Sequence, residues 1–200
     1  MDNKIKDYCF RDIRSRDIEN ECLNIDCLVK RGKLYVLDSG TVLYTGSRVE
    51  DPHTKYNASH KITKTKEEIF NYTGMRSKTN TISNYVSYFS TNVETGKGYA
   101  INPAFGWVTK FYTTKPIYVY KLDTFLDFEE VDECFCKFPK TTHDIELNGI
   151  YVDYGFMNGV DQNEFAICNS WEYMDYMGTA IMEKNRELLP FKILYSVVNE

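Results

Sequence analysis

The residue with the clearest capacity for chemistry is Glu164, in a short β-prone segment. A strand has a side-chain period of two, so Glu164 and Ala166 share one face while Phe165 and Ile167 share the other. The apolar pair indicates a face turned to the core, which leaves the carboxylate facing the opposite side. A carboxylate in such a position can stabilise a developing positive charge. Gln162 lies two residues earlier, on the same face.

Two tyrosines and a glycine-containing segment supply further candidates. Tyr88 and Tyr99 lie eleven positions apart, and flat rings of this kind can stack on a heteroaromatic ligand. The turn-like segment Thr45-Gly46-Ser47 lies upstream of both. Each of these features has an ordinary structural explanation when it is taken singly, so any functional interpretation depends on their combination.

Three segments together resemble, in chain order, the three sequence blocks of the ADP-ribosyltransferase superfamily, especially its poly(ADP-ribose) polymerase-like branch. The first is similar to that branch's Leu-Trp-His-Gly-Ser-Arg strand. Part of the second, Phe89-Ser90-Thr91, also resembles the Ser-Thr-Ser motif of the toxin-like branch, with Asn92 replacing the final Ser. The resemblance covers about 34–171. The three blocks are Leu43-Tyr44-Thr45-Gly46-Ser47-Arg48, then Tyr88-Phe89-Ser90-Thr91 with Tyr99-Ala100, then Asn163-Glu164-Phe165-Ala166-Ile167-Cys168.

The resemblance implies a protein that cleaves the nicotinamide–ribose bond of NAD and transfers ADP-ribose to a macromolecular acceptor or to water. It implies that Tyr88 and Tyr99 sandwich the nicotinamide and that Glu164 stabilises an oxocarbenium-like ribose. Tyr88, Glu164 and Thr45 are the implied catalytic residues, and Gln162 is implied to orient the acceptor. The implied NAD-binding residues are Tyr44, Gly46, Ser47, Arg48, Ser90, Thr91 and Tyr99. NAD is the substrate, and no metal is expected.

The first block departs from the family at Thr45, where the polymerase-like branch has His and the toxin-like branch has Arg to hold the ribose or phosphate. A Thr hydroxyl can donate only one short hydrogen bond. Two interpretations stay open: an active enzyme with weaker NAD binding, in which Arg48 reaches a pyrophosphate, and an inactive member that serves as a binding or interaction module. RNA 2′-phosphotransferases are a further relative by resemblance, but clustered basic residues of the kind they need are not evident.

The C-terminal part of the chain carries a rival resemblance. His143, then Tyr154-Gly155-Phe156, then Asn169-Ser170-Trp171 are similar to the His and Asn-Ser-Trp segments of papain-like cysteine proteases. Cys9 would then be the nucleophile, with His143 moving protons and Asn169 orienting the His. The Gln-x-x-Cys-x-x-Cys-Trp signature of that family is missing around Cys9. We therefore expect Cys9, His143 and Asn169 to lie out of hydrogen-bonding reach of one another.

Composition favours one soluble domain over 1–200. The chain is 42% hydrophobic, with 16 Tyr and 12 Phe, which suits a single packed core. A net charge of −5 with scattered Lys and Arg argues against nucleic acid as a partner, and no segment resembles a signal peptide or membrane span. The six cysteines lack zinc spacing and are too sparse for a disulfide scaffold, which predicts reduced thiols in the cytoplasm. The expected partners are NAD and a protein acceptor.

Apolar periodicity predicts a helical N-terminal region over 1–31. The resemblance implies that 33–200 form an ADP-ribosyltransferase-like core. A long loop is predicted over 48–65, and 106–112 with 116–122 are predicted to form a hairpin. Without regular strand–helix alternation, a doubly wound parallel sheet is disfavoured. Further strands are predicted at 33–37, 41–44, 85–90, 148–154, 164–168 and 191–198, and helices at 64–72, 93–100 and 123–138.

These elements predict an α+β fold, which the resemblance specifies further as a split mixed β-sheet with flanking helices. The three blocks would then meet where the two halves of the sheet separate. We accordingly expect Tyr44, Tyr88, Tyr99 and Glu164 to converge on one cleft between the two halves.

Overall fold

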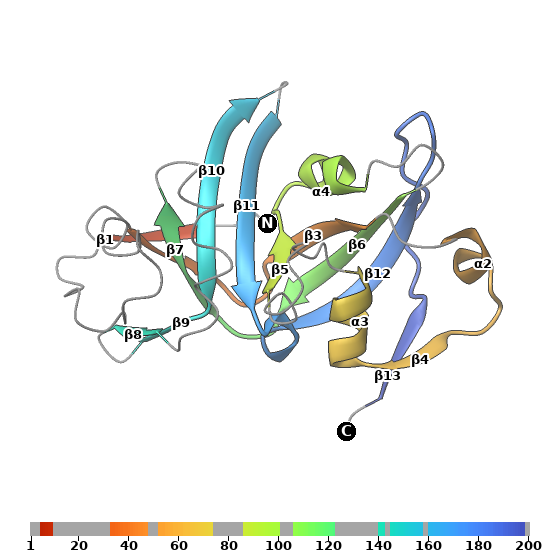
Figure 1. Cartoon of the computed structure of the whole chain (residues 1–200), viewed down its shortest axis with the longest axis horizontal. Coiled ribbons are helices and arrows are strands. Elements are labelled where there is room, and N and C mark those ends of the chain that lie inside the picture. The colour runs from red at the N-terminus through yellow and green to blue at the C-terminus, as the bar shows by residue number, and fades with distance from the viewer. Residues whose placement is uncertain are drawn as a thin grey trace.

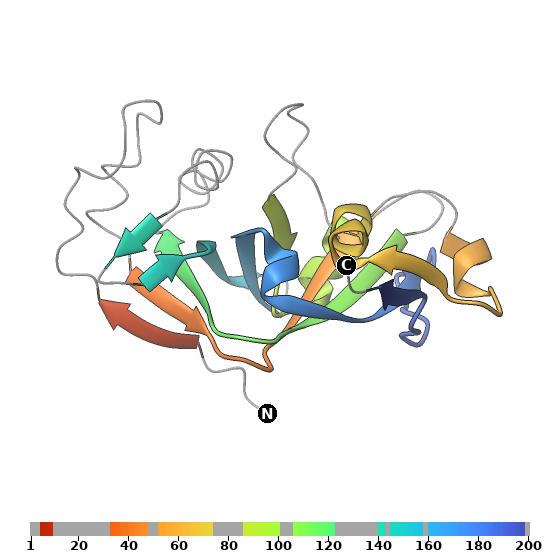
Figure 2. The same cartoon turned by 90° about the horizontal axis from the view of Figure 1, so that it is seen from below.

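Most of the described chain is β-structure, arranged as two main sheets with a few short helices (Figure 1 and Figure 2). The strand directions are mixed, so the α+β class expected from the sequence is confirmed. No helix among the described residues is long and apolar enough to cross a membrane. The computed structural model describes residues 5–9, 33–47, 52–73, 86–100, 106–122, 140–142, 145–157 and 160–198.

The larger sheet has six strands in the described chain, in the spatial order β1-β2-β7-β10-β11-β5. Neighbouring strands are antiparallel except β7 and β10, which are parallel. The strands are β1 (Ile5–Cys9), β2 (Lys33–Leu37), β5 (Val86–Phe89), β7 (Ile117–Leu122), β10 (Gly149–Met157) and β11 (Val160–Cys168).

The smaller sheet has three antiparallel strands in the same part of the chain, in the order β12-β6-β3. These are β3 (Val42–Ser47), β6 (Gly106–Thr113) and β12 (Met174–Met182). Two strand pairs lie outside the main sheets: β4 (Ile62–Thr65) with β13 (Tyr195–Val198), and β8 (Lys140–Thr142) with β9 (Ile145–Leu147). The helices are α2 (Pro52–Tyr56), α3 (Lys66–Thr73), α4 (Val93–Tyr99) and the 3₁₀ turn η3 (Ser170–Glu172).

The two sheets are joined where β3 meets β5. The Tyr44 amide donates to the Ser90 carbonyl over 2.7 Å, and the Ser90 amide donates to the Tyr44 carbonyl over 2.8 Å. Among the described residues, this is the only pair through which β3 and β5 exchange backbone hydrogen bonds. The strands therefore follow the path β10-β11-β5-β3-β6-β12, and the sheet is split between β5 and β3 beyond this one pair.

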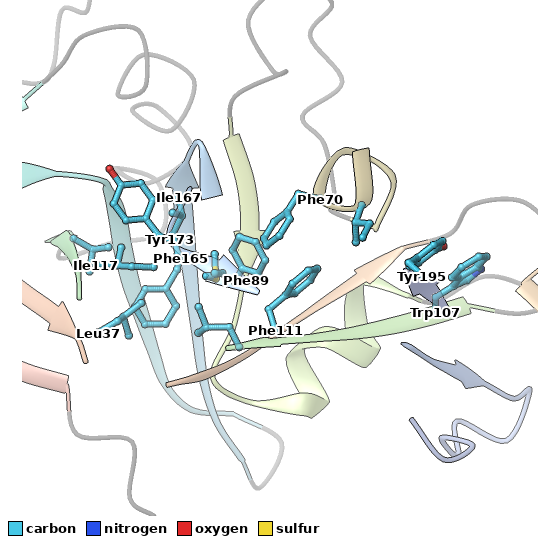
Figure 3. Close-up of a cluster of buried hydrophobic side chains, with 14 of the residues drawn as sticks. Leu37, Phe70, Phe89, Trp107, Phe111, Ile117, Phe165, Ile167, Tyr173 and Tyr195 are labelled. Carbon is cyan, nitrogen blue, oxygen red and sulfur yellow. The ribbon is translucent and has the colours of Figure 1, made fainter. Parts of the chain in front are cut away.

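One side of both sheets carries the main apolar core. The rings of Phe70, Phe89 and Phe111 point toward one another (Figure 3), with centroids 4.3 Å apart for Phe70 and Phe111 and 5.7 Å apart for Phe89 and Phe111. Tyr151 on β10 stacks on Phe165 of β11, with centroids 4.5 Å apart. Such pairs add about 1 kcal/mol each to the burial of the rings. The core thus holds α3 and strands of both sheets together across the split.

The predicted hairpin of 106–112 and 116–122 is wrong, although both of its strands are present. Strand β6 pairs with β3 and β12 in the smaller sheet, whereas β7 pairs with β2 and β10 in the larger one. Because both edges of each strand are occupied by other partners, β6 and β7 do not pair with each other. Likewise β2 and β3, which are joined by Asp38-Ser39-Gly40-Thr41, belong to different sheets.

The predicted N-terminal helix is contradicted at Ile5–Cys9, which form strand β1 against β2. Pairing along the edge of the larger sheet overrides the helical spacing of the apolar residues there. The rest of 1–31 lies outside the described residues, as does the predicted helix over 123–138. The long loop predicted over 48–65 contains α2 and β4 in its described part.

Several predicted elements are confirmed with small changes. The helix predicted over 64–72 begins later, at Lys66, because Thr65 caps it: the Thr65 amide donates to Glu68 Oε2 and the Glu68 amide donates to Thr65 Oγ1. The strand expected over 41–44 continues to Ser47. Strand β12 was not predicted from the sequence, because Gly178, with φ of +149°, introduces a register shift that breaks the alternation.

The expectation of reduced thiols is wrong for Cys168, at the end of β11. This residue is disulfide-bonded. Disulfides persist mainly in oxidising compartments. The cytoplasmic location stays a prediction, and the disulfide at Cys168 argues against it.

Candidate functional site

The three sequence blocks lie on adjacent strands at the centre of the strand path. The first block is on β3, the second begins on β5, and the third is on β11, which pairs with β5. The second block continues into α4 (Figure 1), which contacts β3, β6 and β11. This helix lies on the side of β3 opposite the aromatic core, because Gly46 faces α4 whereas Leu43, on the other face of the strand, belongs to the core. Segments far apart in the sequence thereby meet around the split.

Glu164 is held on the α4 side of β11. It is 7% exposed, and its neighbours Phe165 and Ile167 belong to the core on the other face, as the alternation predicts. The Tyr154 hydroxyl donates a 2.6 Å hydrogen bond to Glu164 Oε2. A buried carboxylate requires such donors, because an unpaired buried charge is costly. The site thus contains a shielded carboxylate with one oxygen already engaged.

Tyr99, the last residue of α4, lies beside this carboxylate. Its hydroxyl oxygen is shielded from solvent. Burial, followed by the negative charge of Glu164, raises the pKa of Tyr99 far above its ordinary value of 10.0; Tyr154 and Tyr88 add smaller contributions. The phenol therefore stays neutral at physiological pH. These interactions bring Tyr88, Tyr99, Tyr154 and Glu164 into one cluster.

Two glycines allow α4 to approach β3. A Cβ on Gly46 would lie 2.1 Å from the Gly96 carbonyl oxygen and 2.6 Å from the Ala100 amide nitrogen. Gly96 in turn faces the Tyr44 side chain. Asn92 caps the helix, its side chain accepting from the Glu94 amide over 2.9 Å. The position of Tyr99 over the split therefore depends on a backbone-to-backbone contact that only glycine permits.

The second and third blocks are tied together by Asn163. Its Oδ1 accepts from Ser90 Oγ over 2.9 Å and from the Thr91 amide over 3.0 Å, while its Nδ2 donates to Thr91 Oγ1 over 2.6 Å. Ser90 Oγ also accepts from the Asn92 amide over 3.0 Å, next to the start of α4. Ser90 and Thr91 thus connect β11 to the residues that begin the helix carrying Tyr99.

Gly46 also presents backbone groups to the split. In an antiparallel ladder the N–H and C=O groups of successive residues point alternately to the two neighbouring strands. Those of Tyr44 bond to β5, so those of Gly46, two residues on, point to the same side. At that position β3 and β5 no longer exchange backbone hydrogen bonds in the described chain. An N–H donor and a C=O acceptor therefore line the split beside α4.

Thr45 and Ser47 face the opposite side of β3. Thr45 is fully buried and lies opposite Thr109 of β6, which lies opposite Thr179 of β12. The two hydroxyls of Thr109 and Thr179 are 3.2 Å apart. We call Thr45, Thr109 and Thr179 the threonine row. The side chain of Thr45 is therefore on the core side of the sheet, away from α4 and Glu164. The sequence did not predict this orientation.

The remaining predicted site residues are Tyr44, Gln162 and Arg48. Tyr44 is on the α4 side of β3, but its ring packs toward Phe191, with centroids 6.2 Å apart. Gln162 lies two residues before Glu164 on β11, so it shares the face of the carboxylate, and it is half-buried. Arg48 lies outside the described residues. Of the four residues expected to converge, the structure brings Tyr88, Tyr99 and Glu164 together.

Tyr154 and Asn163 are site residues that the sequence prediction did not assign. Tyr154 lies in a β-bulge of β10, between Asp153 and Gly155, where the register with β11 shifts. The Asp-x-Gly pattern offers a signal, because Asp favours a local turn and Gly accepts a positive φ. The signal marks only the bulge, since the contact with Glu164 depends on the pairing of two strands.

Two residues of the rival protease site, Cys9 and Asn169, lie on distant parts of the larger sheet in the described chain. Cys9 is on β1, and Asn169 follows the end of β11. β1 and β11 are four strand spacings apart in the larger sheet, roughly 19 Å. Cys9 and Asn169 are therefore far beyond hydrogen-bonding distance, as expected, and His143 lies outside the described residues.

Comparison with known proteins adds no relative to this picture. No protein family, curated protein or solved structure matches the chain. Among the described residues, no group of three or more His, Cys, Asp or Glu side chains is arranged to hold a metal ion.

Proposed function

We propose that this chain is an NAD-dependent ADP-ribosyltransferase with Glu164 as its central catalytic residue. The observation that carries the proposal is the adjacency of the three sequence blocks. They occupy β3, β5 and β11, and Glu164 faces Tyr99 and Tyr88 next to the split. Segments that resemble a binding site only in their order would have no reason to meet on one face, so their meeting supports a shared site.

The groups around the split suit the nicotinamide half of NAD. Tyr99 and Tyr88 offer flat rings for stacking, and the neutral phenol of Tyr99 adds no charge to repel the dinucleotide phosphates. The N–H and C=O groups of Gly46 match the carboxamide of nicotinamide, which carries one acceptor oxygen and an NH₂ donor. Together these residues would hold the leaving group beside Glu164.

The proposed reaction breaks the bond between ribose C1′ and the nicotinamide nitrogen. The bonding electron pair leaves with nicotinamide, and positive charge develops on the ribose. The Glu164 carboxylate stabilises that charge in a site shielded from water, where electrostatic interactions are strong. An acceptor oxygen or nitrogen, from water or a macromolecule, then bonds to C1′ and releases a proton. Gln162, on the face of Glu164, would orient that acceptor.

The second candidate function is NAD binding without turnover, and the position of Thr45 favours it. The family's His or Arg at this position holds the ribose or phosphate, whereas the Thr45 side chain here lies in the core. The chain thus lacks that contact from β3. A binding or interaction module of the same fold would retain the tyrosines and Gly46 and would release no nicotinamide.

The test combines calorimetric titration with NAD and an assay of nicotinamide release on wild type, Glu164→Gln and Tyr99→Ala. Glu164→Gln keeps the size of the side chain and removes its charge, so we expect nicotinamide release to fall at least a hundredfold, about 3 kcal/mol, with NAD binding retained. Tyr99→Ala should weaken NAD binding. The matched control is Glu187→Gln, which changes an exposed glutamate.

The outcomes separate the two candidate functions. Wild-type protein that binds NAD but releases no nicotinamide supports the binding module. If Glu164→Gln keeps full activity, Glu164 is not the catalytic carboxylate. Absence of NAD binding by the wild type rejects both candidates.

A further inference from the structure

Tyr154 occupies an unusual position in β10. Val152 lies opposite Glu164, and Asp153 lies opposite Asn163, but the next residue paired with β11 is Gly155, opposite Gln162. Tyr154 is thus the extra residue of a bulge. The bulge is closed locally, because the Gly155 amide donates to Asp153 Oδ1 over 2.8 Å and Gly155 has a φ of +68°. Bulges of this kind redirect side chains and occur often beside active sites.

The redirected side chain ends on the carboxylate. The Tyr154 hydroxyl donates to Glu164 Oε2 at 2.6 Å, within the short range typical of hydrogen bonds to an ionised acceptor. Tyr154 itself is only half-buried, whereas Glu164 is almost completely buried. A tyrosine ring has few rotamers, so its hydroxyl is held in place with little loss of conformational entropy. The carboxylate is therefore fixed through one oxygen by a group from the neighbouring strand.

We propose that Tyr154 is a positioning residue for Glu164: the Tyr154 hydroxyl, through its hydrogen bond to Oε2, holds the carboxylate in the orientation that the reaction requires. The proposal rests on the proposed function for the identity of that reaction. The pairing itself is a property of the ligand-free protein. Tyr154 thus supports the catalytic residue from β10, while Tyr99 approaches the same carboxylate from α4.

The pairing predicts a titration effect that a purely structural residue would not produce. The titratable groups that the structure places around Glu164 are Tyr154 on β10, Tyr99 on α4 and, beside Tyr99, Tyr88 on β5. A hydrogen bond donated to the charged form of a carboxyl favours that form. Its removal in Tyr154→Phe should therefore move the titration midpoint of Glu164 to higher pH, by roughly one unit or more.

The experiment follows the carbon-13 signal of the Glu164 carboxyl with pH in wild type and Tyr154→Phe, the signal being identified by its loss in Glu164→Gln. Nicotinamide release is measured on the same samples. We expect kcat to fall about tenfold or more with KM for NAD nearly unchanged, because the positioning acts on the reacting residue and not on binding. The control is Tyr112→Phe, which removes a hydroxyl donating to another carboxylate, Asp175 Oδ2, at 3.0 Å. This control should change neither measurement.

A second variant guards against a loss of folding in Tyr154→Phe. Gly155→Ala keeps the phenol but strains the bulge, because a residue with a Cβ is disfavoured at a φ of +68°. It should move the titration midpoint and kcat in the same directions. An unchanged Glu164 midpoint in folded Tyr154→Phe overturns the positioning proposal, even if the wild type releases nicotinamide. A raised midpoint in a protein that never releases nicotinamide upholds the pairing and rejects the proposed enzymatic function instead.

Discussion

The two faces of the central strands bury hydroxyl groups in different surroundings. On the α4 side, the hydroxyls of Tyr99 and Tyr154 lie around the Glu164 carboxylate. On the core side, the threonine row places Thr109 against Thr179, whose hydroxyl also lies 3.1 Å from the Tyr176 hydroxyl. The first cluster contains a charge and the second contains only neutral hydroxyls. Only the α4 side therefore offers electrostatic stabilisation to a charged transition state.

The two faces of β3 also separate residues that are adjacent in the sequence. Thr45 and Gly46 are adjacent in the first block, yet the strand places their side-chain positions on opposite faces. Gly46 lies under α4, whereas Thr45 belongs to the threonine row. Substitutions in β3 should therefore have different effects at the two positions, and Gly46→Ala and Thr45→Val test this division.

The largest effect is expected for Gly46→Ala. The new Cβ would lie 2.1 Å from the Gly96 carbonyl oxygen, so α4 must move away from β3. We expect a loss of about 3 kcal/mol in the free energy of unfolding, measured by urea denaturation, together with weaker NAD binding because Tyr99 moves with the helix. Gly98→Ala on the same helix is the control, since its Cβ meets nothing within 4 Å. That control should stabilise the protein by up to about 1 kcal/mol, and equal losses in both variants would contradict the packing described.

A smaller effect is expected for Asn163→Ala, which tests the connection between the second and third blocks. The substitution leaves Ser90 Oγ, the Thr91 amide and Thr91 Oγ1 without the Asn163 amide group. We expect the free energy of unfolding, measured by thermal or chemical denaturation, to fall by about 2 kcal/mol. In the control Asn185→Ala, an exposed asparagine loses one bond, from the Glu187 amide, and the expected cost is below about 0.5 kcal/mol. If the two substitutions cost the same, Asn163 does not hold β11 to the second block.

Local patterns in the sequence predicted much of the central structure, because they depend on neighbouring residues. The strand at Val86–Phe89, the helix at Val93–Tyr99 and the opposite faces of Glu164 and Phe165 all follow from residue type and spacing. The pairing of strands does not follow from residue type and spacing. The apolar runs of β6 and β7 look like a hairpin because the chain between them is short and polar. The partners of β6, for example, are β3 and β12, which lie about sixty or more residues away in the sequence.

Local sequence patterns predict only part of the site for the same reason. The order of the blocks predicted that Tyr88, Tyr99 and Glu164 belong together, since their segments could be recognised singly. Tyr154 could not be recognised, because its role arises from a register shift between β10 and β11. The side on which Thr45 faces could not be read from the block either, since it depends on which face of β3 receives α4. A close approach at Gly46 is the physical feature that decides it.

The smallest and most discriminating effect is expected for Thr45→Val. Thr45 Oγ1 is buried and has no hydrogen-bond partner among the described residues, and valine has nearly the same shape. Replacing an unsatisfied buried hydroxyl with a methyl group removes a desolvation cost. We therefore expect the free energy of unfolding to rise by up to about 1 kcal/mol. NAD binding should be unchanged, because the side chain faces the core. The control Thr109→Val loses its contact with Thr179 at 3.2 Å and should cost about 1 kcal/mol instead. Calorimetric NAD titration and urea denaturation on both variants distinguish the two positions. A folded Thr45→Val protein with weakened NAD binding would show that Thr45 contacts the dinucleotide, as its place in the first block implies, and that the division between the two faces of β3 is wrong.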